Sequence, residues 1–259
     1  VVGVGTSVIT ATFTPDDTNN YLTGATTTFN VTVTQGAQTN ALVINSTAVT
    51  YGSTLSLTTT GGSGSGSNSF AVDSGPCTVS GSTLTPTAAG TCMVTATKAA
   101  NGNYLAASSL STAITVNPKG LTVSGLTGVN KEFDRGLSAT ATGTPTLEGK
   151  VGSDDVLLGG TPVFTFASSN VATGITITAT GYTLTGTTAS NYTLTQPTVT
   201  ANITAKAARV AATNTTVAFG AAVTSGVIAS GLISPDAVGS ASYTYTGTGT
   251  ATPPTAVGV

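Results

Sequence analysis

Two cysteines, Cys77 and Cys92, are the first residues of this 259-residue sequence whose type and spacing define a chemistry. They are the only cysteines in the chain, and each begins a short strand-like segment. An even count in a secreted-looking chain favours a disulfide, with two free buried thiols as the alternative. A bond closing a loop of about 15 residues would stabilise the fold by roughly 3 kcal/mol. Zinc would need two further ligands, so we expect no metal site.

Glu132 and Asp134 are the carboxylates whose spacing could serve catalysis. On a strand, residues i and i+2 share a face at roughly 6.5–7 Å, near the separation found in an inverting glycosidase. No aromatic platform accompanies them, and Lys131 and Arg135 flank them. We therefore predict a solvated charge cluster and no enzymatic activity.

Two acidic pairs, Asp16-Asp17 and Asp154-Asp155, could offer oxygen ligands to calcium. Neither pair lies in an EF-hand loop, so we favour turn chemistry, in which the side chains bind nearby backbone N–H groups. A Lys–Asn isopeptide bond needs a lysine, an asparagine and a carboxylate together in an apolar core. Its candidate residues, which no recognisable motif frames, are Lys98 or Lys131 with Asp73 or Glu132.

The composition excludes several classes of function. Charged residues make up 6% of the chain, against roughly a quarter in an ordinary soluble domain, and the net charge is −2. This balance argues against nucleic-acid binding, and the lack of histidine removes the imidazole base and metal ligand. With 39% hydrophobic residues the chain is not typical of disorder. No apolar run reaches the roughly 18–20 residues of a membrane span. The chain begins at Val1 without an initiator Met or a leader, and we expect it to be part of a longer protein.

The pattern of hydrophobic residues predicts strands almost everywhere. Apolar residues alternate with threonine, which supplies about a fifth of the chain, in Phe29–Thr34, Ser53–Thr58, Ile175–Thr178 and Tyr182–Thr185. Turn residues separate these runs at Gly61–Gly66, Asn101-Gly102, Gly159-Gly160 and Ser234–Asp236. A helical turn is expected at most around Asp154–Leu158. Short strands at this spacing indicate β-sandwich-like modules.

Two markers recur along the chain with a period near 86 residues. An Asn-Tyr pair occurs at Asn20-Tyr21, Asn103-Tyr104 and Asn191-Tyr192. An aromatic residue followed by a turn residue occurs at Tyr51-Gly52, Phe133-Asp134 and Phe219-Gly220. We predict that each tyrosine of the first marker packs over the end of its module with its hydroxyl bonded to backbone, and that the asparagine fits an adjacent turn. A ligand-stacking role is the alternative.

The phase of the markers predicts the domain boundaries. Residues 37–118 form one complete module, which contains the cysteines, and residues 119–207 form a second. Residues 1–36 contain the C-terminal half of a module and residues 208–259 the N-terminal half of another. A half-module leaves a hydrophobic face and an open strand edge. Either the sequence is a window on a longer periodic chain, or the two ends complement one another head to tail between molecules.

The sequence resembles known bacterial repeat families. Leu121–Leu126, Lys131–Asp134, Gly152–Val156 and Ser190–Pro197 resemble the YDG repeats of large surface proteins of the filamentous-haemagglutinin and adhesin type. The Tyr-Asp-Gly that names the family reads Phe133-Asp134-Arg135-Gly136 here, so the tyrosine hydroxyl is missing. Residues 37–117, with Thr50–Ser53 and Ala99–Tyr104, resemble bacterial immunoglobulin-like repeats. The end pieces resemble halves of the same group, including its MBG relatives.

These observations together predict an all-β chain of tandem β-sandwich-like modules, with a terminal module split between the two ends. The expected function is that of a structural segment of a long extracellular bacterial repeat protein, a stalk, filament or adhesin shaft at the cell surface. The alternative is a carbohydrate- or protein-binding adhesin module that acts through its loops on host or matrix glycans. The expected partners are other copies or adjacent modules, head to tail. We expect no cofactor, no nucleic acid and no membrane span.

Overall fold

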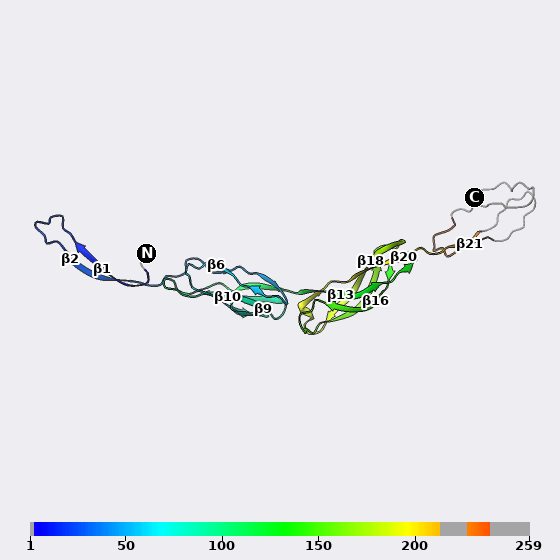
Figure 1. Ribbon diagram of the computed structural model, residues 1–259, viewed down its shortest axis with the longest axis horizontal. Helices are drawn as coiled ribbons and strands as arrows, with labels where there is room; N and C mark the ends of the chain where they lie inside the picture. The colour runs from blue at the N-terminus through cyan, green and yellow to red at the C-terminus, as the bar shows by residue number, and fades with distance from the viewer. Residues whose placement is uncertain (1–2, 213–226, 239–259) are drawn as a thin grey trace, which may run out of the picture. The chain divides into compact units, whose positions relative to one another are not determined.

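The structure is a computed structural model that describes residues 3–212 and 227–238 (Figure 1). Regular structure in these residues is β-strand apart from one three-residue 3₁₀ turn, which confirms the expected all-β fold. No helix in this described part of the chain has the length and hydropathy to cross a bilayer.

Backbone contacts divide the chain into two units, each assembled from stretches that are separate in the sequence. The first unit comprises Val1–Leu121, Gly149–Leu157 and Leu184–Leu194, and the second comprises Thr122–Glu148, Leu158–Thr183 and Thr195–Val259. The loops 149–157 and 184–194 thus fold against the earlier part of the chain. This placement matters below, because both loops contribute to the candidate site.

The chain starts with an isolated antiparallel hairpin of β1 (Gly5–Phe13) and β2 (Ala25–Val33). The strand expected at Phe29–Thr34 lies in β2 and is confirmed. The alternating apolar residues nevertheless remain exposed, with 40% of Ile9 and 52% of Phe29 accessible. Period-two alternation therefore forms the strands here without a described core to cover them.

Residues 43–117 form three sheets of short strands. The strands are β3 (Val43–Ile44), β4 (Ala48–Thr50), β5 (Leu55–Ser56), β6 (Thr59–Thr60), β7 (Asn68–Ser74), β8 (Cys77–Ser80), β9 (Thr83–Pro86), β10 (Gly90–Lys98), β11 (Ala107–Ser108) and β12 (Thr112–Asn117). The largest sheet has the order β11-β10-β12-β4, with β7 also paired to β10, and the others are β5-β9-β8 and β3-β6. The run expected over Ser53–Thr58 forms only the two-residue strand β5.

Alternate residues of β10 build the core of these sheets. Cys92, Val94 and Ala96 are fully buried, as are Ile114 of β12 and Leu84 of β9. The intervening residues of β10 are at least partly exposed, which is the period expected of a strand with one covered face. Cys77 and Cys92 form the expected disulfide, with their Cα atoms 6.2 Å apart. The bond joins β8 to β10 and so links two different sheets.

The remaining described elements are also β-strands, apart from one 3₁₀ turn. They are β13 (Lys119–Gly128), β14 (Lys131–Glu132), β15 (Ser138–Ala139), β16 (Ala141–Glu148), β17 (Leu157–Phe166), β18 (Ala172–Thr185), η1 (Ala189–Asn191), β19 (Tyr192–Leu194), β20 (Thr198–Thr204), β21 (Arg209–Ala212) and β22 (Val227–Ser230). Their sheets have the orders β16-β13-β19, β14-β20-β18-β17-β15 and β21-β22. The core of the second unit consists of Phe166, Ile175, Ile177, Ala201 and Ile203.

The structure corrects one local expectation and refines two others. The turn predicted at Gly159-Gly160 lies inside β17, because Gly160 has a φ of +89° and approaches β18 so closely that a Cβ would lie 2.1 Å from the carbonyl oxygen of Gly181. The strands predicted at Ile175–Thr178 and Tyr182–Thr185 are confirmed, and both lie within one continuous strand, β18. The helical turn expected at most around Asp154–Leu158 does not form in these described residues: Asp154–Val156 are irregular, and Leu157 begins β17.

Candidate functional site

Two tyrosines and one carboxylate meet in the first unit. Tyr51 follows β4 and Tyr192 begins β19, and their rings pack edge to face with centroids 5.6 Å apart. Both hydroxyls donate to the same oxygen of Asp154, at 2.9 Å from Tyr51 and 2.5 Å from Tyr192. The backbone N–H of Val151 donates to the Tyr192 hydroxyl at 2.9 Å. We call Tyr51, Asp154, Asn191 and Tyr192 the tyrosine–aspartate cluster.

Local turns present these four side chains. Gly52 has a φ of +81°, and a Cβ there would lie 2.4 Å from a methyl of Val151, so glycine is required beside Tyr51. Asn191 ends the 3₁₀ turn η1 and is 5% exposed. Its Oδ1 accepts a hydrogen bond from the N–H of Ala89 at 2.8 Å. The predicted bond between tyrosine hydroxyl and backbone is thus confirmed for Tyr192, whereas the carboxylate partner was not foreseen.

The cluster holds its tyrosines neutral. Burial, followed by the hydrogen bond to Asp154, raises the pKa of Tyr192 to about 12. Burial and the same carboxylate also raise the pKa of Tyr51 above its ordinary value of 10.0. Ionising either phenol would place a second negative charge beside Asp154 in a partly desolvated setting.

A pH dependence follows from these shifts. The pKa of Tyr192 is higher in the folded chain than in the unfolded chain, so its contribution to stability is complete below pH 10 and is lost between pH 10.0 and about 12. An alkaline titration of tyrosinate absorbance should therefore show a late-ionising component. Tyr192→Phe should remove the share of that component that belongs to Tyr192, leave the share of Tyr51, and flatten the fall in stability. A late component of unchanged size in Tyr192→Phe would contradict the assignment.

A related contact lies in the second unit, around the marker Phe133-Asp134. Arg135 has a φ of 66° and its guanidinium contacts the carboxylate of Asp236 at 2.5 Å. Asp134 accepts bonds from Lys131 Nζ at 2.7 Å and from the N–H of Gly136 at 2.8 Å, which lower its pKa. The arginine that interrupts the expected Tyr-Asp-Gly thus meets an aspartate, as Tyr51 does.

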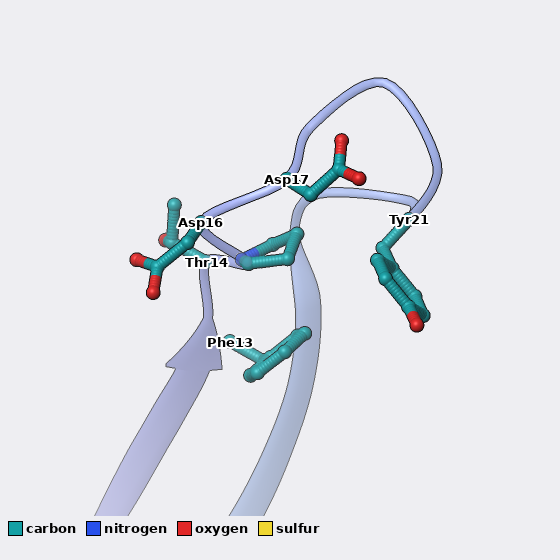
Figure 2. A pocket seen from close by; sticks show the side chains of 6 residues that line it. Phe13, Thr14, Asp16, Asp17 and Tyr21 are labelled. Carbon is teal, nitrogen blue, oxygen red and sulfur yellow. The ribbon is translucent and has the colours of Figure 1, made fainter.

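The other acidic residues have separate local partners. Glu132 forms an ion pair with Lys206 at 3.3 Å. Because β14 ends before Asp134, Glu132 and Asp134 do not lie on one strand, and the shared strand face considered from the sequence does not form. Asp17 accepts bonds from the backbone of Asn19 and Asn20, which is the predicted turn chemistry. Figure 2 shows Asp16 on the opposite side of this loop from Tyr21.

Two more expectations concern metal ligands and the isopeptide bond. Asp155 bonds to the backbone and hydroxyl of Thr187 at 2.9 and 3.0 Å, while Asp154 belongs to the tyrosine–aspartate cluster. Among the residues that the structure describes, no three His, Cys, Asp or Glu side chains gather as metal ligands would. Of the isopeptide candidates, Asp73 accepts hydrogen bonds from Thr95 and Ser111, and Lys131 donates to Asp134, so these two side chains have other partners.

The other Asn-Tyr pairs occupy different surroundings. Tyr104 is half-buried and its backbone forms a parallel bridge with Gly36, while Asn103 is exposed. Asn20 bonds to Asp17, and Tyr21 is 65% exposed, so the expectation that Tyr21 packs against its module is wrong for the described residues. Phe219 lies outside the described residues.

Sequence reasoning missed the role of Asp154, although a signal for it exists. Asp154 is followed two residues later by Val156, and the same spacing recurs 82 residues on at Asp236 and Val238. Both aspartates close a short turn through their backbone N–H, to Val151 at 3.1 Å and to Ile233 at 2.9 Å. This periodicity marks Asp154 as part of the repeat.

The described residues therefore define an all-β protein whose recurring markers make side-chain contacts. In a comparison with known families, the YDG domain matches residues 117–201, so this part of the chain contains a YDG domain. The match covers most of the stretch for which the sequence shows that resemblance. No curated protein matches the chain.

Proposed function

We propose that this chain is a structural segment of a long extracellular bacterial repeat protein, a stalk, filament or adhesin shaft. In this proposal residues 37–118 and 119–207 are β-sandwich-like modules stacked end to end, the first immunoglobulin-like and the second of the YDG type with MBG relatives. The YDG domain at 117–201 supports the class of the second module. The low content of charged residues suits close packing between modules.

The tyrosine–aspartate cluster is the observation that carries the proposal. Tyr51 belongs to the aromatic marker of one repeat, while Asn191 and Tyr192 form the Asn-Tyr marker of the next. The cluster therefore uses the repeated residues themselves to join successive repeats, with hydrogen bonds of 2.9 and 2.5 Å to a shared carboxylate. Contacts of this kind would hold successive repeats in one orientation relative to each other. A stalk needs such a fixed orientation, whereas an isolated binding domain does not.

Distances between spin labels on the two sides of the cluster would test this joint. Labels at Leu110→Cys and Leu157→Cys use side chains that are 88% and 59% exposed and lie on the repeats before and after it. We expect a narrow distance distribution that broadens when Asp154→Ala removes the shared acceptor. A label pair within one repeat, at Val43→Cys and Leu110→Cys, should stay narrow in both backgrounds.

A distribution that is already broad in the unmodified chain, with the control pair narrow, would overturn the stacked-module proposal. The extracellular assignment has its own test, which is immunogold labelling of intact, unpermeabilised source cells. Labelling only after permeabilisation would contradict a surface role.

A further inference from the structure

The sequence of the exposed hairpin β1–β2 is similar to that of strands that are buried elsewhere in the same chain. Gly5–Phe13 reads GTSVITATF and Gly90–Lys98 reads GTCMVTATK. The two hairpins also share one register, because Ser7 pairs with Val31 as Cys92 pairs with Ile114. The residues that face the core from β10 and β12 thus have counterparts on one face of β1 and β2.

Burial differs sharply between the two copies of this face. Val94 and Ile114 are fully buried, whereas their counterparts Ile9 and Val31 are 40% and 36% exposed. In the buried copy, residues earlier in the same repeat are buried as well, namely Leu42, Ile44, Leu57 and Leu84, and Cys77 is bonded to Cys92 on this face. The hairpin β1–β2 therefore presents a face made to receive the N-terminal half of a repeat.

Residues 206–212 and 227–238 have the features of such an N-terminal half. Lys206–Val210 corresponds to Lys119–Val123, and β21 pairs with β22 as β13 pairs with β16. Leu121 is fully buried, but its counterpart Ala208 is exposed, as is every residue from Thr204 to Val210. Two larger apolar residues of this part are exposed as well, Val210 at 66% and Ile228 at 58%.

A backbone pairing shows which residues would meet. Gly36 pairs in parallel with Tyr104, and Lys119 pairs in parallel with Tyr192. Gly36 lies three positions after Val33, the last apolar residue of β2, and Lys119 lies three positions after Val116, the last apolar residue of β12. Lys206 lies three positions after Ile203, the last apolar residue of β20, and is therefore the equivalent pairing residue.

The second unit also offers a place for a tyrosine ring beside Lys206. A groove of about 230 Å³ is lined by Phe133, Val171, Lys206, Leu232, Ile233 and Asp236. Phe133 and Asp236 are the counterparts of Tyr51 and Asp154, which contact Tyr192 in the tyrosine–aspartate cluster. The counterpart of Tyr192 that another copy could supply is Tyr21, the tyrosine of the first Asn-Tyr pair. Tyr21 is 65% exposed on its loop (Figure 2).

We infer that the hairpin β1–β2 of one copy completes the half-repeat to which residues 206–212 and 227–238 of a second copy belong. Tyr21 enters the groove beside Phe133, with its hydroxyl on Asp236, and residues 21–23 add a parallel strand to the open edge at 206–208. This contact is heterologous, so repeating it joins successive copies head to tail rather than as an isologous dimer. The inference extends the proposed stalk function, since it applies the joint between repeats to the contact between molecules.

Cysteine cross-linking of the full chain tests this register. By the pairing of Gly120 with Thr193, Leu22 should lie opposite Ala207 of the second copy. Neighbouring strands are about 4.8 Å apart, within the Cα separation of about 4.4–6.8 Å that a disulfide spans. Oxidation of the Leu22→Cys, Ala207→Cys variant should give a ladder of multiples of 25.1 kDa on a non-reducing gel. Leu110→Cys with Ala207→Cys is the control, because Leu110 is as exposed as Leu22 but has no expected contact.

Sedimentation of the unmodified chain supplies the second measurement. Its mass should rise with concentration, and Tyr21→Ala should shift it towards 25.1 kDa while Leu110→Ala does not. A chain that stays monomeric, equal ladders from both cysteine pairs, or a cross-link confined to the monomer band would each overturn the inference. None of these outcomes touches the stalk proposal, which the label distances within one chain decide separately.

Discussion

Replacing Asp154 by alanine is expected to lower the free energy of unfolding of the first unit by roughly 3 kcal/mol, because a hydrogen bond to a charged group contributes about 1.5–3 kcal/mol and two are lost. The hydroxyls of Tyr51 and Tyr192 both donate to this carboxylate. Their rings are only 7% and 6% exposed, so little water can replace the acceptor. Urea unfolding measures the loss, and hydrogen exchange should localise it to the loops 149–157 and 184–194.

The neighbouring carboxylate is the matched control for this prediction. Asp155→Ala also removes a side chain with two hydrogen bonds, but both reach Thr187 on the exposed surface, where water can replace them, so the loss of stability should be much smaller. In the Asp154→Ala background, Tyr51→Phe should add little, because its hydroxyl has already lost its acceptor. Equal losses from the two aspartate variants would contradict a special role for Asp154.

Reduction of the Cys77–Cys92 bond is expected to destabilise the first unit by about 3 kcal/mol, the value for a closed loop of about 15 residues. The effect arises mainly in the unfolded chain, which gains conformational freedom when the bond is removed. Because the bond joins β8 to β10, the sheet β5-β9-β8 should lose its protection against exchange first. Unfolding curves with and without a thiol reductant provide the measurement.

A variant without the bond separates reduction from side effects of the reductant. The double change Cys77→Ala, Cys92→Ala should be less stable than the oxidised chain and insensitive to the reductant. Unit two carries no cysteine, so hydrogen exchange in the core around Phe166 should not change. A loss below about 1 kcal/mol would mean that the reduced chain retains the loop, contrary to the entropic account.

The correspondence between sequence and structure is closest where hydrophobic residues alternate with threonine. Alternation places Cys92, Val94 and Ala96 on one face of β10, and the same pattern forms β1. Alternation does not reveal whether the face is covered, since coverage depends on residues far away in the sequence. Val94 and Ile9 therefore have the same local signal and opposite burial.

The glycine positions divide in the same way. A pair of glycines predicts a turn from local freedom alone, which fails at Gly159-Gly160 because β18 passes close to the backbone there. At Tyr51-Gly52 the prediction of a turn residue is correct, yet the reason for glycine is again a distant contact, with Val151. Local conformation is encoded locally, whereas close approach between strands is not.

Residue type and short-range spacing are sufficient to predict the all-β class, the period near 86 residues and the pair of cysteines that forms the disulfide. That Asp154 accepts from both Tyr51 and Tyr192, and that Arg135 pairs with Asp236, emerges only in the folded chain. These partners lie 38 to 103 residues apart, and their pairing depends on how turns from successive repeats are brought together in space. A side chain's partner is fixed by the fold, whereas its type and period are fixed by the sequence.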